Sequence, residues 1–180
     1  MNAMDLQNYQ RSLRRLVTGG PPAADDPPYV RELAGSPRLD IVREVIGFWR
    51  SHALERYCVL SAAWLKRQGR FEAEIRRFIA AGDFSPEVAL AGQQFLRQLT
   101  RDADAVVQAL ARFEIALHET RYDPAESRCV DWPCDPRPVL DCLLGGSAPE
   151  PGGDKVPHRV TVCRALPGGY CCEPLPAGSG

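Results

Sequence analysis

The cysteines are the residues of this chain whose type and spacing could most readily do chemistry. Six of the seven follow residue 122, and only Cys58 precedes it. Cys129 and Cys134 are separated by four residues, a spacing that permits two ligands of a structural zinc site. Cys171 and Cys172 are adjacent, which makes a second chelating pair unfavourable. Unrelated reduced thiols are our main interpretation, with zinc at Cys129 and Cys134 or a disulfide in this region as alternatives.

Two His/Glu pairs on expected helices form the other candidate set. Glu114 and His118 are one helical turn apart, and His52 and Glu55 are three residues apart. Di-iron helical bundles use Glu-x-x-His motifs, and neither pair has that order. A stand-alone helical metal enzyme therefore remains an alternative function rather than the leading one.

Other catalytic signatures are missing from the sequence. It has three histidines and no phosphate loop, dinucleotide fingerprint or nucleophile elbow. Its formal net charge is −1, with 17 basic and 15 acidic residues before residue 122 and 5 and 8 after it. Neither part has the basic surface typical of a nucleic-acid-binding protein. We therefore expect no nucleic-acid partner and no catalytic residue in this chain.

The N-terminal sequence predicts a cytoplasmic location. It lacks the basic and apolar regions of a signal peptide, and no apolar run reaches the roughly 20 residues that span a bilayer. We expect no membrane partner and, in a reducing compartment, free thiols.

Residues 1–122 have the periodicity of amphipathic helices, and we expect them to form an antiparallel helical bundle. A proline-rich acidic stretch around Asp25 is expected to be a mobile loop. Apolar residues between 39 and 53 cover so broad a face that the sequence predicts a helix packed on more than one side. Its stripe contains Leu39, Val42, Ile46, Trp49 and Ala53, flanked by Ile41, Val45 and Phe48.

Residues 123–180 are expected to form a small α+β part. A short helix is predicted over 138–144, a strand over 159–164 and a return strand over 170–173, with a turn at 167–169. The stretch up to Lys155 and the last five residues are expected to be flexible. The fold class is thus mainly α, an antiparallel bundle followed by a C-terminal peptide-recognition part.

The strand over 159–164 is a candidate for binding an extended peptide. If it lies at the edge of a small sheet, its free backbone groups could pair with a peptide strand. An ordinary hairpin that covers the bundle is the alternative. The candidate contact residues are Arg159, Val160, Thr161, Val162, Cys163 and Arg164.

Several phrases resemble a family of helical partner proteins, in that family's order. They are Leu6-Gln-Asn-Tyr-Gln-Arg-Ser-Leu13 with Val17, the segment Leu110–Glu119, Pro138-Val-Leu140 with Leu144, and Arg159–Arg164. These proteins accompany TIM-barrel multinuclear non-haem iron enzymes that modify cysteines in ribosomally made peptides. The partners of the methanobactin and 3-thiaglutamate pathways are members. The segment from Trp49 to Cys58 is most similar to the 3-thiaglutamate type.

The resemblance implies a non-catalytic partner that binds the iron enzyme and presents a precursor peptide. Iron would lie in the partner enzyme, with no cofactor in this chain. The bundle would contact the enzyme, and Arg159–Arg164 would contact the peptide by strand addition. The six cysteines of the C-terminal part depart from the family pattern. A zinc- or redox-responsive regulatory module therefore remains a further alternative.

Overall fold

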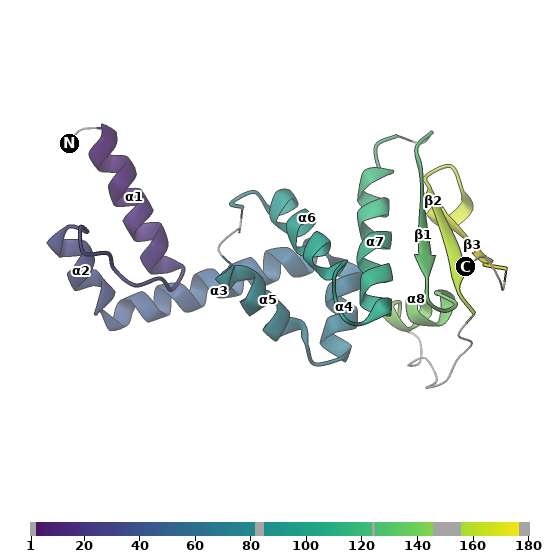
Figure 1. Ribbon diagram of the computed structural model, residues 1–180, viewed down its shortest axis with the longest axis horizontal. Helices are drawn as coiled ribbons and strands as arrows, with labels where there is room; N and C mark the ends of the chain where they lie inside the picture. Colours follow the sequence, from purple (N-terminus) through teal and green to yellow (C-terminus); the bar gives the residue numbers. More distant parts are fainter. Residues whose placement is uncertain (1–2, 82–84, 124, 146–155, 177–180) are drawn as a thin grey trace. The chain divides into compact units, whose positions relative to one another are not determined.

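The computed structural model describes residues 3–81, 85–123, 125–145 and 156–176. The described residues form eight α-helices and one three-stranded antiparallel sheet near the C-terminus, so the mainly α class is confirmed (Figure 1). The expected flexible stretch 146–155 and residues 177–180 lie outside the described residues. The helices are α1 (Ala3–Val17), α2 (Pro28–Ala34), α3 (Pro37–Tyr57), α4 (Val59–Arg67), α5 (Phe71–Ala80), α6 (Val88–Leu99), α7 (Ala105–Glu119) and α8 (Arg137–Leu143).

The chain packs as two compact units, each made from two separate stretches of the sequence. The first unit comprises residues 1–53 and 72–85, and the second comprises residues 54–71 and 86–180. The helices that end the expected bundle share a core with the C-terminal sheet, because the apolar face of the sheet needs a cover. The division into 1–122 and 123–180 stays a prediction about the domains of the chain.

In the first unit, α1 and α2 enclose a small apolar cluster of Leu16, Val30 and Leu39. The loop between these helices is held by a buried carboxylate, Asp26. Its oxygens accept hydrogen bonds from Ser12 (Oγ to Oδ1, 2.5 Å), from Arg15 and from the backbone N–H of Ala23 (2.6 Å). Side-chain hydrogen bonds thus hold a loop that lacks apolar periodicity, and the expected mobility of this stretch stays a prediction.

Helix α3 begins in the first unit. Much of the broad apolar face that the sequence predicts to be packed is exposed. Leu39 is buried and Ile46 and Ala53 are half-buried, but Val42 and Trp49 of the expected stripe are exposed. Trp49 and Phe48 are 61% and 64% exposed, so the prediction that this helix packs on more than one side fails here. The exposed apolar residues of α3, which we call the α3 stripe, are Ile41, Val42, Val45, Phe48 and Trp49.

In the second unit, α7 packs against α4 and α6. The helical segment that starts at Pro37 breaks at Cys58, where α3 ends and α4 begins. Cys58 is buried, and its Sγ lies 3.6 Å from the carbonyl oxygen of Gly92 on α6. A Cβ at Gly92 would come within 2.0 Å of the Tyr57 ring, so glycine allows this close approach.

The sheet consists of β1 (Ser127–Trp132), β2 (His158–Cys163) and β3 (Tyr170–Pro174), in the order β1-β2-β3. The predicted strand, return strand, short helix and turn are confirmed. Strand β1 was not predicted, since its alternation covers only Val130 and Trp132 before Pro133. Helix α7 covers the face that carries these two side chains, and Phe113 meets the Trp132 ring edge-on at 6.0 Å.

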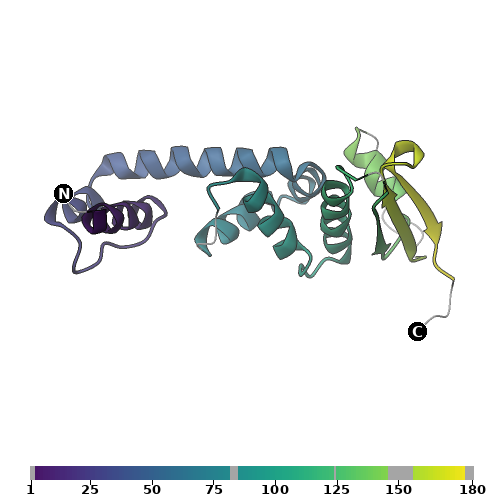
Figure 2. The ribbon, with the colours of Figure 1, turned by 90° about the horizontal axis from the view of Figure 1, so that it is seen from above.

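Both views show α7 on the β1 side of the sheet and β3 as the strand farthest from it (Figures 1 and 2). The edge formed by β3 is therefore away from the covering helix. Among the described residues, no helix has both the length and the apolar character needed to cross a membrane.

Candidate functional site

The candidate peptide-binding strand is the central strand of the sheet. β2 pairs with β1 on one side, where Val160 lies opposite Val130, and with β3 on the other, where Val160 lies opposite Cys172. The expectation that this strand offers a free edge is therefore wrong, because both rows of its backbone groups are used within the sheet. Peptide contact by Arg159–Arg164 stays a prediction, but strand addition requires an outer strand.

The side chains of β2 have partners on both faces of the sheet. Val160 and Val162 are fully buried against α7 and its neighbours. On the opposite face, Arg159 donates to Asp131 (Nε to Oδ1, 2.7 Å), which lowers the pKa of that carboxyl group. Arg164, just beyond the strand, donates to the carbonyl oxygen of Arg121 at 3.1 Å. These residues stabilise the sheet.

The register identifies the free backbone groups of β3. The N–H of Leu175 donates to the carbonyl oxygen of Pro157 at 2.8 Å, and these residues are directly opposite in the β2–β3 register. Hydrogen-bonded pairs alternate along an antiparallel ladder. The N–H groups of Cys171 and Glu173 therefore face β2, whereas those of Tyr170 and Cys172 face outward. β3 thus offers two outward N–H groups to an added strand.

A pocket of about 490 Å³ lies at the start of β3. Its two charged lining residues, Arg121 and Arg164, are both basic. Such a pocket favours an acidic group on a ligand that lies along the neighbouring edge. It is lined by Leu117, Thr120, Arg121, Tyr122, Arg164 and Gly169.

The α3 stripe is the other unusual surface. Its members recur at three- and four-residue spacing, which places them on one helix face. At its end Phe48 lies edge-on to Trp49, with ring centroids 5.8 Å apart, and stacks with His52 at 6.2 Å. Contiguous exposed apolar residues that include aromatic rings are typical of protein-binding surfaces.

The two His/Glu pairs have structural partners in place of a shared metal site. Both oxygens of Glu114 accept backbone N–H bonds, from Leu60 at 2.9 Å and from Ser61 at 3.0 Å, at the start of α4. Burial raises the pKa of Glu114, and these two bonds oppose that rise. His118 lies 3.2 Å from the carbonyl oxygen of Tyr57 and stacks on its ring.

His52 and Glu55, the second His/Glu pair, also have partners in the structure. Glu55 forms an ion pair with Lys66 at 2.5 Å, and His52 stacks on Phe48. Sequence reasoning missed that Glu114 caps a helix, because the segments that meet there are 53 residues apart. These contacts give no support to the stand-alone metal enzyme.

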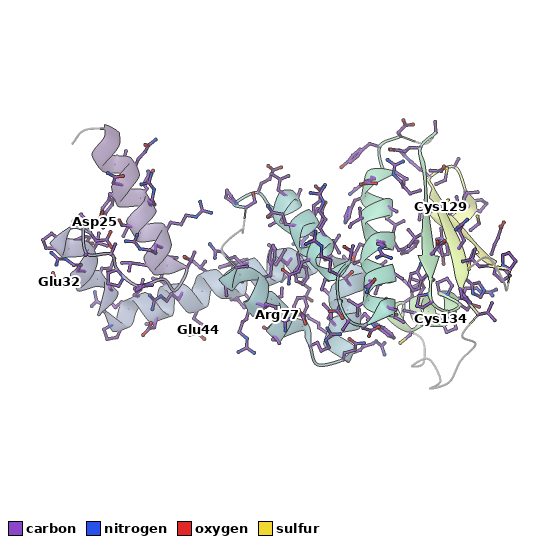
Figure 3. All side chains as sticks on the ribbon, viewed as in Figure 1. Asp25, Glu32, Glu44, Arg77, Cys129 and Cys134 are labelled. Carbon is purple, nitrogen blue, oxygen red and sulfur yellow. The ribbon has the colours of Figure 1, made fainter. Side chains whose placement is uncertain are left out.

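Cys129 and Cys134, the alternative zinc ligands, lie in different surroundings (Figure 3). Cys129 is exposed on the face of the sheet opposite α7, where its Sγ lies 3.7 Å from the Thr161 hydroxyl. Cys134 lies beyond the end of β1 and is half-buried, which raises the pKa of its thiol, with the Asp135 charge contributing.

A different group of potential metal ligands forms at the end of the sheet. Asp135, His158 and Cys172 place one oxygen, nitrogen and sulfur ligand atom within 4.8 Å of one another. It is the only group of three found in the described ranges, and it includes neither Cys129 nor Cys134. Sequence reasoning missed it because the pairing of Trp132 with His158 brings the loop after β1 to this end.

Comparison of the chain with models of known protein families, with curated proteins and with solved structures found no match.

Proposed function

We propose that this chain is a non-catalytic partner protein that binds a TIM-barrel multinuclear non-haem iron enzyme. In this proposal it presents a ribosomally made precursor peptide to that enzyme for cysteine modification. The observation that carries the proposal is the α3 stripe, five exposed apolar residues on one face of one helix. Covering such a face removes apolar area from water, which is the main favourable contribution to protein association.

The α3 stripe is the proposed contact for the iron enzyme. Large aromatic residues dominate the binding energy of many interfaces, so Phe48 and Trp49 are the expected anchors. Iron and the oxidative chemistry belong to the partner enzyme. This chain would contribute binding and orientation.

The outer edge of β3 is the proposed contact for the precursor peptide. A peptide strand would pair with the outward N–H and C=O groups of Tyr170 and Cys172. An acidic side chain of the peptide would lie in the pocket beside Arg121 and Arg164. This replaces the contact first expected at β2, whose backbone groups pair within the sheet.

Co-purification tests the enzyme contact. The tagged chain is expressed with its genomic neighbours, and the eluate is assayed for a second protein and for iron. We expect a stoichiometric barrel protein that carries the iron, and its loss when Phe48 and Trp49 are both replaced by serine. Val88 and Leu90 are exposed apolar residues of α6, and their double serine variant is the matched control. Equal recovery with both variants would overturn the α3 contact.

Proline substitution tests the peptide contact. Cys172→Pro removes an outward N–H and leaves the β2–β3 bonds intact, so peptide affinity should fall while the fold persists. Cys172→Ala keeps the N–H and controls for loss of the thiol. Cys171→Pro, whose N–H faces β2, should instead disrupt the hairpin. Unchanged peptide affinity in a folded Cys172→Pro variant would refute strand addition at β3.

A further inference from the structure

The three side chains at the end of the sheet come from three separate segments. Asp135 lies in the loop between β1 and α8, His158 begins β2, and Cys172 lies within β3. His158 is 5% exposed and projects from the same face as Val160 and Val162, since these residues alternate along the strand. Cys172 lies opposite Val160 and packs against the same core. The sheet therefore directs both side chains to one face.

The hydrogen bond of His158 determines which ring nitrogen is free. Nδ1 lies 2.8 Å from the carbonyl oxygen of Val156, which can only accept, so Nδ1 carries the hydrogen. In the neutral ring Nε2 then has a lone pair. Histidine ligands of metals have this arrangement, in which a backbone carbonyl orients the ring and fixes its tautomer.

Asp135 is also held in place by a neighbour. Arg137 donates through Nε to Oδ1 at 3.0 Å and through Nη2 to Oδ2 at 2.6 Å, and this lowers the pKa of Asp135. The backbone N–H of Arg137 also donates to Oδ1 at 3.0 Å, and Nε is shared with Oδ2 at 3.0 Å. An ionised carboxylate has about four lone-pair sites, so these three donors leave about one site for a cation. Outer hydrogen bonds of this kind orient ligating carboxylates.

We propose that Asp135, His158 and Cys172 bind one zinc ion through a carboxylate oxygen, Nε2 and Sγ. One thiolate, one imidazole and one carboxylate are all zinc ligands, whereas calcium and magnesium require mainly oxygen ligands. In tetrahedral coordination, ligand atoms at zinc bond lengths are about 3.4–3.6 Å apart. The present separations of up to 4.8 Å require a contraction of at most about 1.4 Å, and solvent would occupy the fourth position.

Zinc at this position would tie an edge strand to the rest of the second unit. β3 is paired on one side only, and the ion would connect it to β2 and to the loop before α8. On zinc binding the thiol loses its proton to solvent, and the two ligand anions balance the dication. The inference does not depend on the proposed partner enzyme or peptide.

The test uses the full untagged chain, stripped with a chelator and titrated with zinc in competition with a chromogenic chelator. We expect one zinc per chain. Cys172→Ala and Asp135→Asn should each lower affinity by more than the roughly 10–100-fold that loss of an outer hydrogen-bond partner costs. Cys129→Ser and Cys171→Ser remove thiols from the opposite face and should leave affinity unchanged.

Cobalt gives an independent readout at the same site. A thiolate-to-cobalt charge-transfer band should appear in the wild-type chain and disappear in Cys172→Ala, while circular dichroism shows that the variant remains folded. The absence of bound zinc, or one zinc retained by both ligand variants, would overturn the proposal. Cys172→Ala keeps the backbone N–H of β3, so failure here is distinguishable from failure of peptide binding.

Discussion

The two compact units bury their apolar residues to different extents. In the second unit, α7 contributes Ala109, Leu110 and Phe113 to a core that continues through the sheet. In the first unit, Leu16, Val30 and Leu39 form a small buried cluster and α5 buries Ile75 and Phe78, but the α3 stripe remains exposed. A long apolar helix face is therefore not evidence of a core by itself. The second unit has a core that joins helix and sheet, whereas the first leaves the α3 stripe uncovered.

Truncation of Phe113 should have the largest effect on stability. Its ring is 2% exposed and meets both Trp132 and Tyr170 edge-on. Phe113→Ala removes these contacts and leaves a cavity, so the free energy of unfolding should fall by about 3–5 kcal/mol. Chemical denaturation measures this loss. A loss below about 1 kcal/mol would mean that this core does not stabilise the second unit as proposed.

Removal of the Glu114 carboxylate should cost less. Glu114→Ala leaves the N–H groups of Leu60 and Ser61 without their acceptor, and we expect a loss of about 1.5–3 kcal/mol. Glu119→Ala is the matched control on the same helix. Its ion pair with Arg128 is exposed and contributes about 0.2–1 kcal/mol. Equal losses in the two variants would refute the capping role.

In the first unit, Asp26 should make stability depend on pH. Hydrogen bonds from Ser12 and Arg15 lower the pKa of Asp26 from 3.8 to about 2. Because the folded-state pKa is the lower one, the stabilisation is fully present above pH 3.8 and is lost as pH falls through about 2.

Asp26→Asn tests this dependence. The unfolding midpoint of the variant should lie below that of the wild type at neutral pH, and the gap should narrow between pH 3.8 and 2. Asp25→Asn, in the same loop, is the control for a change of charge alone. A gap that persists at pH 2 would show that the carboxylate charge is not the cause.

Substitution on the α3 stripe should have the smallest effect on stability. Phe48 and Trp49 are more than half exposed, so their double serine variant should unfold within about 0.5 kcal/mol of the wild type. Thermal unfolding of the isolated chain measures this. A loss above about 1 kcal/mol would mean that these rings support the fold, and it would remove the main support for the proposed enzyme contact.

Local pattern predicted much of the secondary structure. Periodicity indicated the long helices, and β-branched residues at 160–162 with the turn at 167–169 indicated the C-terminal hairpin. Strand β1 escaped because Val130 and Trp132 give too short an alternation. The break between α3 and α4 at Cys58 was not predicted, because the apolar periodicity continues through this residue.

The candidate sites were less accessible to sequence reasoning. The prediction of a strand at Arg159–Arg164 is confirmed. Its central position in the sheet depends on pairing with β1, whose paired residues lie 28 or more positions earlier in the sequence. The group of Asp135, His158 and Cys172 has no recognisable spacing, since the β1–β2 and β2–β3 pairings together bring its members to one place. Sites whose residues lie far apart in the sequence have no local pattern that would reveal them.

The sequence by itself determined which segments are helical, where the C-terminal hairpin turns, and which faces are apolar, because these properties depend on neighbours a few residues apart. Only the tertiary structure decided which apolar faces are covered, that β2 is central, and which acidic, imidazole and thiol groups meet at the end of the sheet. Those outcomes depend on contacts between distant segments, whose formation no local pattern encodes.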